Sequence, residues 1–532
     1  MQIVTGQSIV NRIAIGPVLF YRKPQKTVSA ASREAPAARL EKALEQAKQE
    51  LTFLYEKALA EVGEDQAAIF DVHRMMLEDE DFLDAIRDKI AGGQPPEAAV
   101  KAAGSEFSAL FAAMDDDYMR ARAADILDVS ERLYNLLMGI RIGPVLKKPV
   151  ILIADDLTPS ETMQLDRGKL LGFVTRQGSA NSHTAILART MNIPALIGVN
   201  IDESWDGKNA ILDGRSQCLI LDPTTEQLEN SRQAQTADIS RDELLKALKG
   251  QDNITKSGQK VQLFANIGSL ADVDTVLEND AQGIGLFRSE FLYLEAKQLP
   301  TEEQQFSVYR RVAERMSGKK VIIRTLDIGA DKEAPCLPLP QEENPALGYR
   351  AIRICLTQQD IFKTQLRAIL RAAVYGRISV MFPMIISVEE VRQAKALLLQ
   401  CQEELRNEGI AMGEPEIGVM IETPAAVVLA DELAQEVDFF SLGTNDLTQY
   451  TLAIDRQNPR LNPFYDPHHP AILRMIAHTV EAGHRHGCWV GICGELGSDM
   501  TLTAQFLAMG VDELSVSPGK ILPLRAHIRS LP

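Results

Sequence analysis

Apolar residues recur at different spacings along the 532-residue chain, and each change of spacing marks a change of predicted structure. Near the amino terminus, residues 2–4 and 18–21 are rich in β-formers and predict short strands. From about residue 30 to residue 139, apolar residues return every three or four positions, and turn residues gather mainly at 92–96. This second block therefore predicts a bundle of several helices.

Short β-runs replace the helical pattern between about residues 148 and 222, and helical segments separate them, which predicts an α/β unit. Because strands also occur at the amino terminus, the helical block is interpreted as an insertion into this α/β domain. Residues 224–250 are polar and rich in Gln and Glu, which predicts a solvated linker helix. The β-runs of the α/β unit are 150–153, 170–174, 210–212 and 219–221.

Eight further apolar runs alternate with longer helical stretches over the rest of the chain. Their number, and a span of about 280 residues, favour a (β/α)₈ barrel of the TIM type over a doubly wound sheet. The predicted barrel strands are 261–265, 283–287, 321–324, 380–383, 417–421, 439–442, 489–492 and 514–516.

The predicted fold is thus a multidomain α/β protein. Residues 1–24 and 145–223 would form the α/β domain, and residues 25–144 the inserted helical bundle. Residues 224–252 would form the linker helix and residues 253–532 the (β/α)₈ barrel.

Composition narrows the function classes. With 73 acidic and 56 basic residues, the net charge of −17 argues against a nucleic-acid partner. Apolar runs are far shorter than the roughly 20 residues of a membrane span, so no membrane insertion is expected. No secretory signal is visible at the start, and six cysteines without a C-x-x-C pair fit a reducing compartment. We therefore expect a cytoplasmic protein.

The predicted barrel strands end in residues that suit an anionic substrate. A single arginine near a strand end is usually a surface ion pair, but several at one barrel mouth would hold a ligand with both phosphate and carboxylate. Glu422 and Asp446 would suit a Mg²⁺ that takes further oxygens from such a ligand. This combination predicts a Mg²⁺-dependent enzyme acting on a phosphorylated small acid. The residues at these strand ends are Arg288, Arg324, Arg350, Glu422, Asn445, Asp446, Arg456 and Cys493.

His183 is the second candidate for chemistry. Only His73 and His183, of eight histidines, precede residue 460. Ser182 is a candidate N-cap, which would place His183 in the first turn of a helix, where backbone amides and the helix dipole stabilise an anion. An isolated histidine there is usually only tolerated, but imidazole is also a competent nucleophile near neutral pH. A phosphohistidine beside a barrel for a phosphorylated acid suggests a phosphoryl shuttle.

Longer motifs carry a specific resemblance over nearly the whole chain. The motifs are Ser182-His183-Thr184 with Ala188-Arg189, residues 283–290, 324–329, 383–385 and 439–450, and residues 68–73 with 76–80 in the helical insert. In these motifs the chain resembles Enzyme I of the bacterial phosphotransferase system, the phosphoenolpyruvate–protein phosphotransferases.

The resemblance implies a role for each candidate. His183 would accept the phosphoryl group of phosphoenolpyruvate and pass it to a histidine of HPr, and pyruvate would be released. Cys493 would protonate the enolate at carbon 3. The helical insert would dock HPr with His73 near the contact, and the barrel would form a homodimer. The remaining residues would hold substrate (Arg288, Arg324, Arg350, Arg456 and Asn445) and Mg²⁺ (Glu422 and Asp446).

Two departures from the family pattern stand out. Residues 178–183 are Gly-Ser-Ala-Asn-Ser-His, whereas the family usually has Gly-Gly-Arg-Thr-Ser-His, so Ala180 replaces a basic side chain. The transfer rate or the choice of partner could therefore differ. The chain also ends at Pro532, where family members usually continue with one or two more helices, which bears on barrel closure and dimer strength.

Alternative functions share some of these features. Pyruvate phosphate dikinase and phosphoenolpyruvate synthase share the phosphohistidine and barrel modules but need a large ATP-binding domain. No such segment, and no G-x-x-x-x-G-K loop, precedes residue 148. The altered loop before His183 leaves open a phosphohistidine regulator, or a relay to an acceptor other than HPr.

Overall fold

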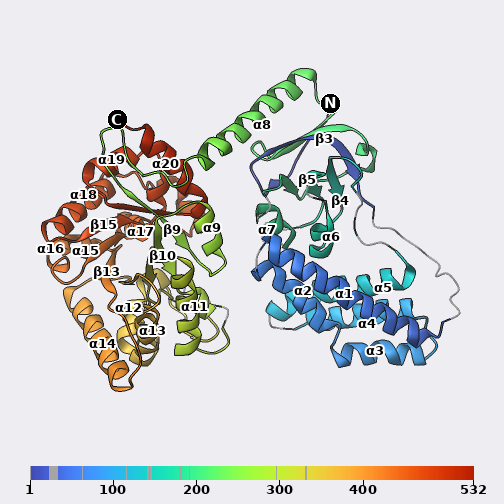
Figure 1. Cartoon of the computed structure of the whole chain (residues 1–532), viewed down its shortest axis with the longest axis horizontal. Coiled ribbons are helices and arrows are strands. Elements are labelled where there is room, and N and C mark those ends of the chain that lie inside the picture. Colours follow the sequence, from blue (N-terminus) through green and yellow to red (C-terminus); the bar gives the residue numbers. More distant parts are fainter. Residues whose placement is uncertain are drawn as a thin grey trace. The chain divides into compact units, whose positions relative to one another are not determined.

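The computed structural model divides the chain into two compact units, Met1–Arg241 and Asp242–Pro532, and each is described by itself (Figure 1). The structure describes residues 2–22, 34–62, 64–114, 117–140, 143, 146–166, 168–178, 183–190, 192–294, 296–329, 332 and 334–532.

An eight-stranded sheet organises the first unit, with the order β1-β8-β7-β3-β4-β5-β6-β2. The amino-terminal strand β3 (Ile13–Phe20) pairs parallel to β4 and antiparallel to β7, so the start of the chain shares one sheet with residues beyond 150. This confirms the α/β fold interrupted by a helical insertion. Strand β6 escaped sequence analysis because it is only three residues long. The other strands are β1 (Gln2–Thr5), β2 (Gln7–Ser8), β4 (Val150–Ala154), β5 (Leu170–Thr175), β6 (Ala195–Ile197), β7 (Asn209–Asp213) and β8 (Cys218–Leu221), and the helices are α6 (Pro159–Gln164), α7 (His183–Thr190) and a 3₁₀ turn at Glu203–Trp205.

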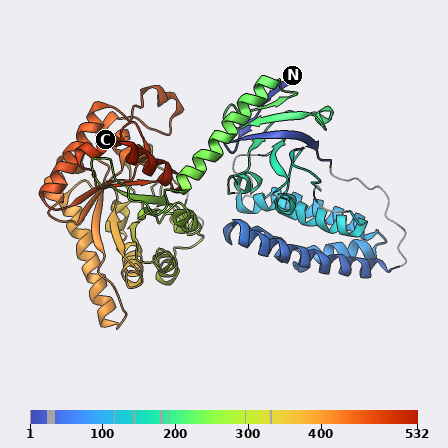
Figure 2. The ribbon, with the colours of Figure 1, turned by 45° about the horizontal axis from the view of Figure 1, so that its top comes forward.

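Five helices form the predicted bundle, and they lie side by side in Figures 1 and 2. Their inward faces share one apolar core, which also takes in Met163 of α6. Lys57 donates to the Met163 carbonyl at 2.6 Å, and Ser160 donates to Asp128 at 3.1 Å. The insert is therefore packed onto the α/β domain rather than tethered to it. The helices are α1 (Pro36–Val62), α2 (Glu64–Met76), α3 (Glu80–Ala91), α4 (Pro96–Ala112) and α5 (Asp117–Met138).

The predicted linker is helix α8 (Thr225–Lys246), which has no buried residue. Its polar sequence leaves no apolar stripe for packing. The division between the two units falls within this helix.

The second unit is the predicted barrel. All eight expected strands are present, each parallel to the next, and β16 pairs with β9 to close the ring. The strands are β9 (Gln262–Ile267), β10 (Gly283–Arg288), β11 (Lys320–Arg324), β12 (Ile378–Phe382), β13 (Glu416–Ile421), β14 (Phe439–Leu442), β15 (Trp489–Ile492) and β16 (Glu513–Val516).

Helices surround the barrel strands (Figure 2). They are α9 (Asp272–Glu278), α10 (Phe291–Leu294), α11 (Glu302–Arg315), α12 (Ile352–Thr357), α13 (Gln359–Ala372), α14 (Val388–Asn407), α15 (Pro424–Val428), α16 (Ala430–Leu433), α17 (Thr444–Leu452), α18 (Pro470–Arg485), α19 (Thr503–Met509) and α20 (Ile521–Ser530), with 3₁₀ turns at Pro345–Leu347, Pro459–Phe464, Glu495–Ser498 and Pro518–Lys520.

The last helix, α20, is tied to the beginning of the barrel by Arg525, whose side chain is 1% exposed. Arg525 donates to Asn253 at 2.7 Å and to the Asp280 carboxylate at 2.5 Å. These bonds join α20 to the segments before β9 and β10. Across the described residues, no helix combines the length and apolarity needed to cross a bilayer.

Candidate active site

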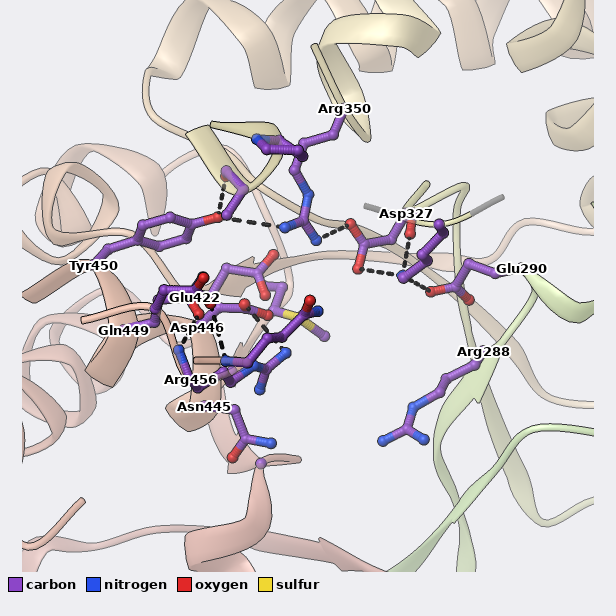
Figure 3. Close-up of a pocket in the computed structure, with 18 of the residues that line it drawn as sticks. Arg288, Glu290, Asp327, Arg350, Glu422, Asn445, Asp446, Gln449, Tyr450 and Arg456 are labelled. Carbon is purple, nitrogen blue, oxygen red and sulfur yellow. Dashed lines mark hydrogen bonds and ion pairs between the residues drawn. The ribbon is translucent and has the colours of Figure 1, made fainter. Parts of the chain in front are cut away.

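A cavity of about 1170 Å³ opens at the carboxyl ends of the barrel strands. Sequence analysis placed candidate residues at these ends because all parallel strands of a barrel point to one mouth. The structure brings every barrel candidate to the wall of this single cavity (Figure 3). These residues are Arg288, Arg324, Arg350, Glu422, Asn445, Asp446, Arg456 and Cys493.

Two of the arginines are buried and held by carboxylates. Arg350 donates from Nη2 to Asp327 at 2.7 Å, and Arg324 lies 3.0 Å from the other oxygen of the same carboxylate. Glu290 pairs with Arg324 as well. Within the described residues, the Nε atoms of both arginines have no hydrogen-bond partner. A buried unpaired donor is costly, so these two groups fit a site that is completed by an anionic ligand.

Asp327 is the electrostatic centre of this arrangement. Burial raises its pKa, but Arg324 and Arg350 lower it more, so the pKa of Asp327 lies well below its usual value. The same contacts shift the pKa of Arg324. Burial lowers this pKa, but Asp327 and Glu290 raise it by more, so it lies above its usual value. The carboxylate is therefore charged and both guanidinium groups keep their positive charge inside the cavity.

Two further arginines line the cavity, and unlike Arg324 and Arg350 they are exposed to solvent. Arg288 is exposed at the end of β10, and Figure 3 shows its side chain pointing into the cavity. Arg456 lies beyond α17, and its Nη2 is 3.4 Å from Asp446. Asn445 accepts the Glu495 amide at 3.0 Å, which fixes its side chain beside Asp446 in the first turn of α17. The cavity thus has two buried guanidinium groups, those of Arg324 and Arg350, and two that are exposed to solvent, those of Arg288 and Arg456.

Glu422 is the most deeply buried of the candidate metal ligands, with 0% of the residue exposed. Its Oε1 accepts the Met384 amide at 2.7 Å, whereas its Oε2 lacks a partner in the part of the chain that the structure describes. Burial and the nearby Asp446 and Asp327 raise its pKa to about 8. A cation at this carboxylate would relieve both the unpaired oxygen and the repulsion from Asp446.

The donor set fits Mg²⁺ better than a metal held wholly by protein. The described residues contain no group of three or more His, Cys, Asp or Glu arranged to hold a metal ion. Glu422 and Asp446 are two oxygen donors, and Mg²⁺ is commonly bound by one or two carboxylates together with substrate phosphate and water.

Cys493 lies at the end of β15, and its residue is 4% exposed. Its Sγ is 3.6 Å from the Leu442 carbonyl. Burial raises the pKa of this thiol to about 12, although the Ser441 hydroxyl lowers it in part. The thiol is therefore protonated at neutral pH, which suits a proton donor and not a nucleophilic thiolate.

His183 is the first residue of α7, as the motif predicted, but it belongs to the other unit. Its side chain and residues 179–182 lie outside the described residues, and so do the proposed Ser182 cap and the Ala180 replacement. The next residue anchors the helix start, because Thr184 Oγ1 donates to the Leu157 carbonyl at 2.6 Å.

His73 does not reach the surface of the bundle, since its residue is 1% exposed. Its ring nitrogens lie 3.5 Å from Asp125 and 3.6 Å from Asp128, both on α5. His73 therefore joins α2 to α5 inside the bundle. Its place near a docked partner stays a prediction.

Several cavity residues were given no role by sequence analysis. Asp327 and Glu290 lay within the motifs that were recognised, but nothing in their spacing showed that they pair with the arginines. Tyr450 contacts Arg350 at 3.3 Å and donates to the Ala346 carbonyl at 2.6 Å. Further lining residues are Lys332, Gln449 and Glu495.

The chain is similar to known proteins that use phosphoenolpyruvate. Three family models match the chain: PEP-utilising enzyme, PEP-binding domain over residues 242–532, N-terminal over 5–122, and mobile domain over 146–217. A phosphoenolpyruvate–protein phosphotransferase of Geobacillus stearothermophilus is 47% identical over 504 residues, which cover 94% of this chain and 87% of the relative. That of Bacillus subtilis (strain 168) is 44% identical over 540 residues, covering 100% and 95%. That of Staphylococcus aureus is 44% identical over 528 residues, covering 98% and 91%.

Proposed function

Since this chain belongs to the PEP-utilising enzymes, and among them to the phosphoenolpyruvate–protein phosphotransferases (Enzyme I), we propose a specific course for its reaction. The phosphoryl group of phosphoenolpyruvate passes to His183 and from there to a histidine of HPr, and pyruvate is released. The part of this proposal that concerns the barrel rests on one observation. Arg324, Arg350 and Glu422 line the same cavity, and each has a buried polar atom without a hydrogen-bond partner among the described residues.

The four arginines divide the work of binding. Arg324 and Arg350 are buried and already oriented by Asp327, so they hold the ligand at a fixed position with little loss of side-chain entropy. Arg288 and Arg456 are exposed and close on the anion when it arrives. Guanidinium groups suit this task because their paired N–H donors match phosphate and carboxylate oxygens.

Mg²⁺ is proposed at Glu422 and Asp446. When bound, the cation supplies positive charge that stabilises the phosphate oxygens during transfer. The protein's own contribution is to keep both carboxylates beside the arginines: the Met384 amide orients Glu422, and the first turn of α17 presents Asp446.

Cys493 is the proposed proton donor to carbon 3 of the enolate. The thiol breaks its S–H bond, a C–H bond forms, and pyruvate results. A buried, protonated thiol at the cavity wall favours this step, and the collapse of enol to ketone drives transfer forward.

For the acceptor HPr we propose the apolar end of the helical bundle. A second cavity of about 230 Å³ lies there, with Phe82, Phe107 and Leu110 in its wall and Asp79 and Asp81 at its rim. Leu110 is 59% exposed. Apolar contact surrounded by carboxylates suits a small basic protein. We further propose that the protein is cytoplasmic and forms a homodimer through its barrel.

The test uses ³²P-labelled phosphoenolpyruvate with Mg²⁺ and no ATP. The label is expected on the wild-type protein, and it should move to added HPr. His183→Ala should abolish labelling, whereas His478→Ala, which alters an exposed histidine of α18, should leave it unchanged.

Each outcome separates the alternatives. Labelling that survives His183→Ala contradicts the assignment of the carrier. Labelling of His183 without transfer to HPr favours the relay to another acceptor that the unusual residues 179–182 left open.

A further inference from the structure

Besides the carboxylates that line the substrate cavity, a further buried carboxyl group lies inside the barrel, beneath that cavity. Glu513 projects from β16, and its residue is 1% exposed. Its Oε1 has no hydrogen-bond partner among the described residues. A buried carboxyl without full pairing destabilises the fold, so its presence points to a task that an apolar residue would not perform.

The neighbouring strands make room for this side chain. A Cβ atom at Gly491 of β15 would lie 2.0 Å from Glu513 Oε2, and one at Gly285 of β10 would lie 2.7 Å from Oε1. Both contacts are closer than real Cβ atoms allow. Glycines on two different strands thus leave the space that the Glu513 carboxyl group occupies.

The strand register places Glu513 beside Gly491, on the strand next to β15 and one inward position below the level of Cys493. Gly491 pairs with Glu513, and residues 491 and 493 face the same side of β15 because side chains alternate along a strand. Cys493 therefore lies one inward position above, roughly 6–7 Å along the strand. Asn266 joins the two levels, since it donates to the Cys493 carbonyl at 2.9 Å and accepts from Ser515 at 2.6 Å.

Two titratable groups shift the pKa of Glu513, namely Lys320 of β11 and Asp512, the residue before β16. Glu513 in turn raises the pKa of Cys493, the residue after β15. Burial raises the pKa of Glu513 well above its usual value, the Ser515 hydroxyl and Lys320 lower it in part, and Asp512 raises it. The net shift favours the protonated carboxyl, which is the form that can donate a proton.

Lys320 interacts electrostatically with Glu513 and lies toward the amino-terminal end of the barrel strands. Its Nζ donates to Glu416 at 2.6 Å and lies 4.6 Å from the centre of the Trp489 ring. Trp489 in turn stacks on Phe439 with ring centres 4.6 Å apart. Since Lys320 and Glu416 begin β11 and β13, this ion pair reaches the amino-terminal end, away from the substrate cavity.

From this arrangement we propose that Glu513 returns a proton to Cys493 after each turnover. The inference rests on the proposed function. Cys493 gives its thiol proton to carbon 3 of the enolate and becomes a thiolate. The O–H bond of Glu513 then breaks as the S–H bond of Cys493 re-forms. The Glu513 carboxylate regains a proton from water through the ammonium group of Lys320, so no other reactant is needed. Glu513 is a positioning residue that acts through Cys493.

The test separates the first turnover from those that follow. Rapid-quench kinetics would measure pyruvate from phosphoenolpyruvate with Mg²⁺ and excess HPr. Glu513→Gln begins with a protonated Cys493, so its first pyruvate should form at the wild-type rate. Later pyruvate should form at least about tenfold more slowly, while KM for phosphoenolpyruvate changes less than twofold. Wild type should show no such burst.

Controls make each outcome decisive. Glu513→Met removes the acid without leaving a polar group, so it should show the same burst even where the Gln variant folds poorly. Glu404→Gln, at an outer ion pair with Lys363, should behave as wild type. First and later turnovers slowed equally, or neither slowed, would overturn the relay and leave Glu513 a structural residue.

An independent measurement needs no turnover. The infrared difference spectrum between wild type and Glu513→Gln at neutral pH should contain the band of a protonated carboxylic acid. Its absence would also overturn the relay. A wild-type protein that releases no pyruvate from phosphoenolpyruvate would instead contradict the proposed function, which keeps the two failures distinct.

Discussion

Arg350 donates to Asp327 at 2.7 Å, and their side chains are only 5% and 3% exposed. Asp327 orients the guanidinium group that is proposed to bind the substrate, and this pairing does not depend on a ligand. Removing the carboxylate would take away the buried carboxylate partner of Arg350 and one of the two carboxylate partners of Arg324.

We therefore expect Asp327→Ala to lower the free energy of unfolding of the barrel by about 3–5 kcal/mol and to raise KM for phosphoenolpyruvate. Urea unfolding of the full chain, together with steady-state kinetics, would measure both. Glu404→Ala, at the partly exposed pair with Lys363, should cost about 1 kcal/mol or less. Equal losses in the two variants would show that the buried pairs do not stabilise the barrel.

Cys493→Ala should separate binding from turnover. With the thiol gone, KM for phosphoenolpyruvate should stay nearly unchanged, while kcat falls by roughly 10²–10⁴-fold because the enolate lacks its acid. Pyruvate release would be followed at several phosphoenolpyruvate concentrations. Cys401→Ala, a buried cysteine of α14 outside the cavity, is the matched control. A comparable loss of affinity and turnover would make Cys493 a packing residue.

Glu422→Gln should weaken the response to Mg²⁺. The amide keeps the shape of the side chain but removes one of two anionic donors, so at least about tenfold more Mg²⁺ should be needed for half-maximal labelling. Calorimetry of phosphoenolpyruvate binding with and without Mg²⁺ gives a readout apart from activity. Glu436→Gln, in an outer ion pair with Arg392, should leave the response as in wild type. An unchanged Mg²⁺ response in Glu422→Gln would contradict the metal site.

Leu110→Asp should uncouple the two transfer steps. A charge in the apolar wall of the bundle cavity should reduce phosphoryl transfer to HPr about tenfold or more, while labelling by phosphoenolpyruvate stays normal. Phe53→Asp changes a residue of α1 that is 63% exposed and does not line this cavity, so transfer should persist. Loss of transfer in both variants would move the docking surface elsewhere.

The ion pair between Arg525 of α20 and Asp280 predicts that the stability of the barrel depends on pH. Burial raises the pKa of Asp280, but the Gly250 amide at 2.7 Å and Arg525 lower it more, so its native pKa lies below the usual value. A depressed native pKa contributes stability that is complete above about pH 4 and is lost as pH falls through the native pKa.

Thermal unfolding between pH 7 and pH 3 would measure this contribution. Asp280→Asn should unfold at a lower temperature than wild type at pH 7, and the two curves should converge at the acid end. A difference that stays constant across the range would show that the Asp280 charge is not the stabilising element.

Sequence alone determined the architecture and most of the barrel site. Eight β-runs alternating with helices specify a closed parallel barrel, and in such a barrel every strand end opens at the same mouth. That one rule brought together Arg288, Arg324, Arg350, Glu422 and Cys493, although up to about 200 positions separate them. Local pattern was sufficient because strand direction and the alternation of side chains decide which residues meet there.

Only the tertiary structure decided which partners these residues have. Asp327 holds two arginines, His73 is buried between two aspartates, and Glu513 occupies space left by glycines on other strands. The sequence spacing of these residues does not predict any of these pairings. Burial and charge partnership depend on contacts across the barrel or the bundle, and those contacts set each pKa and therefore the chemistry that each side chain can perform.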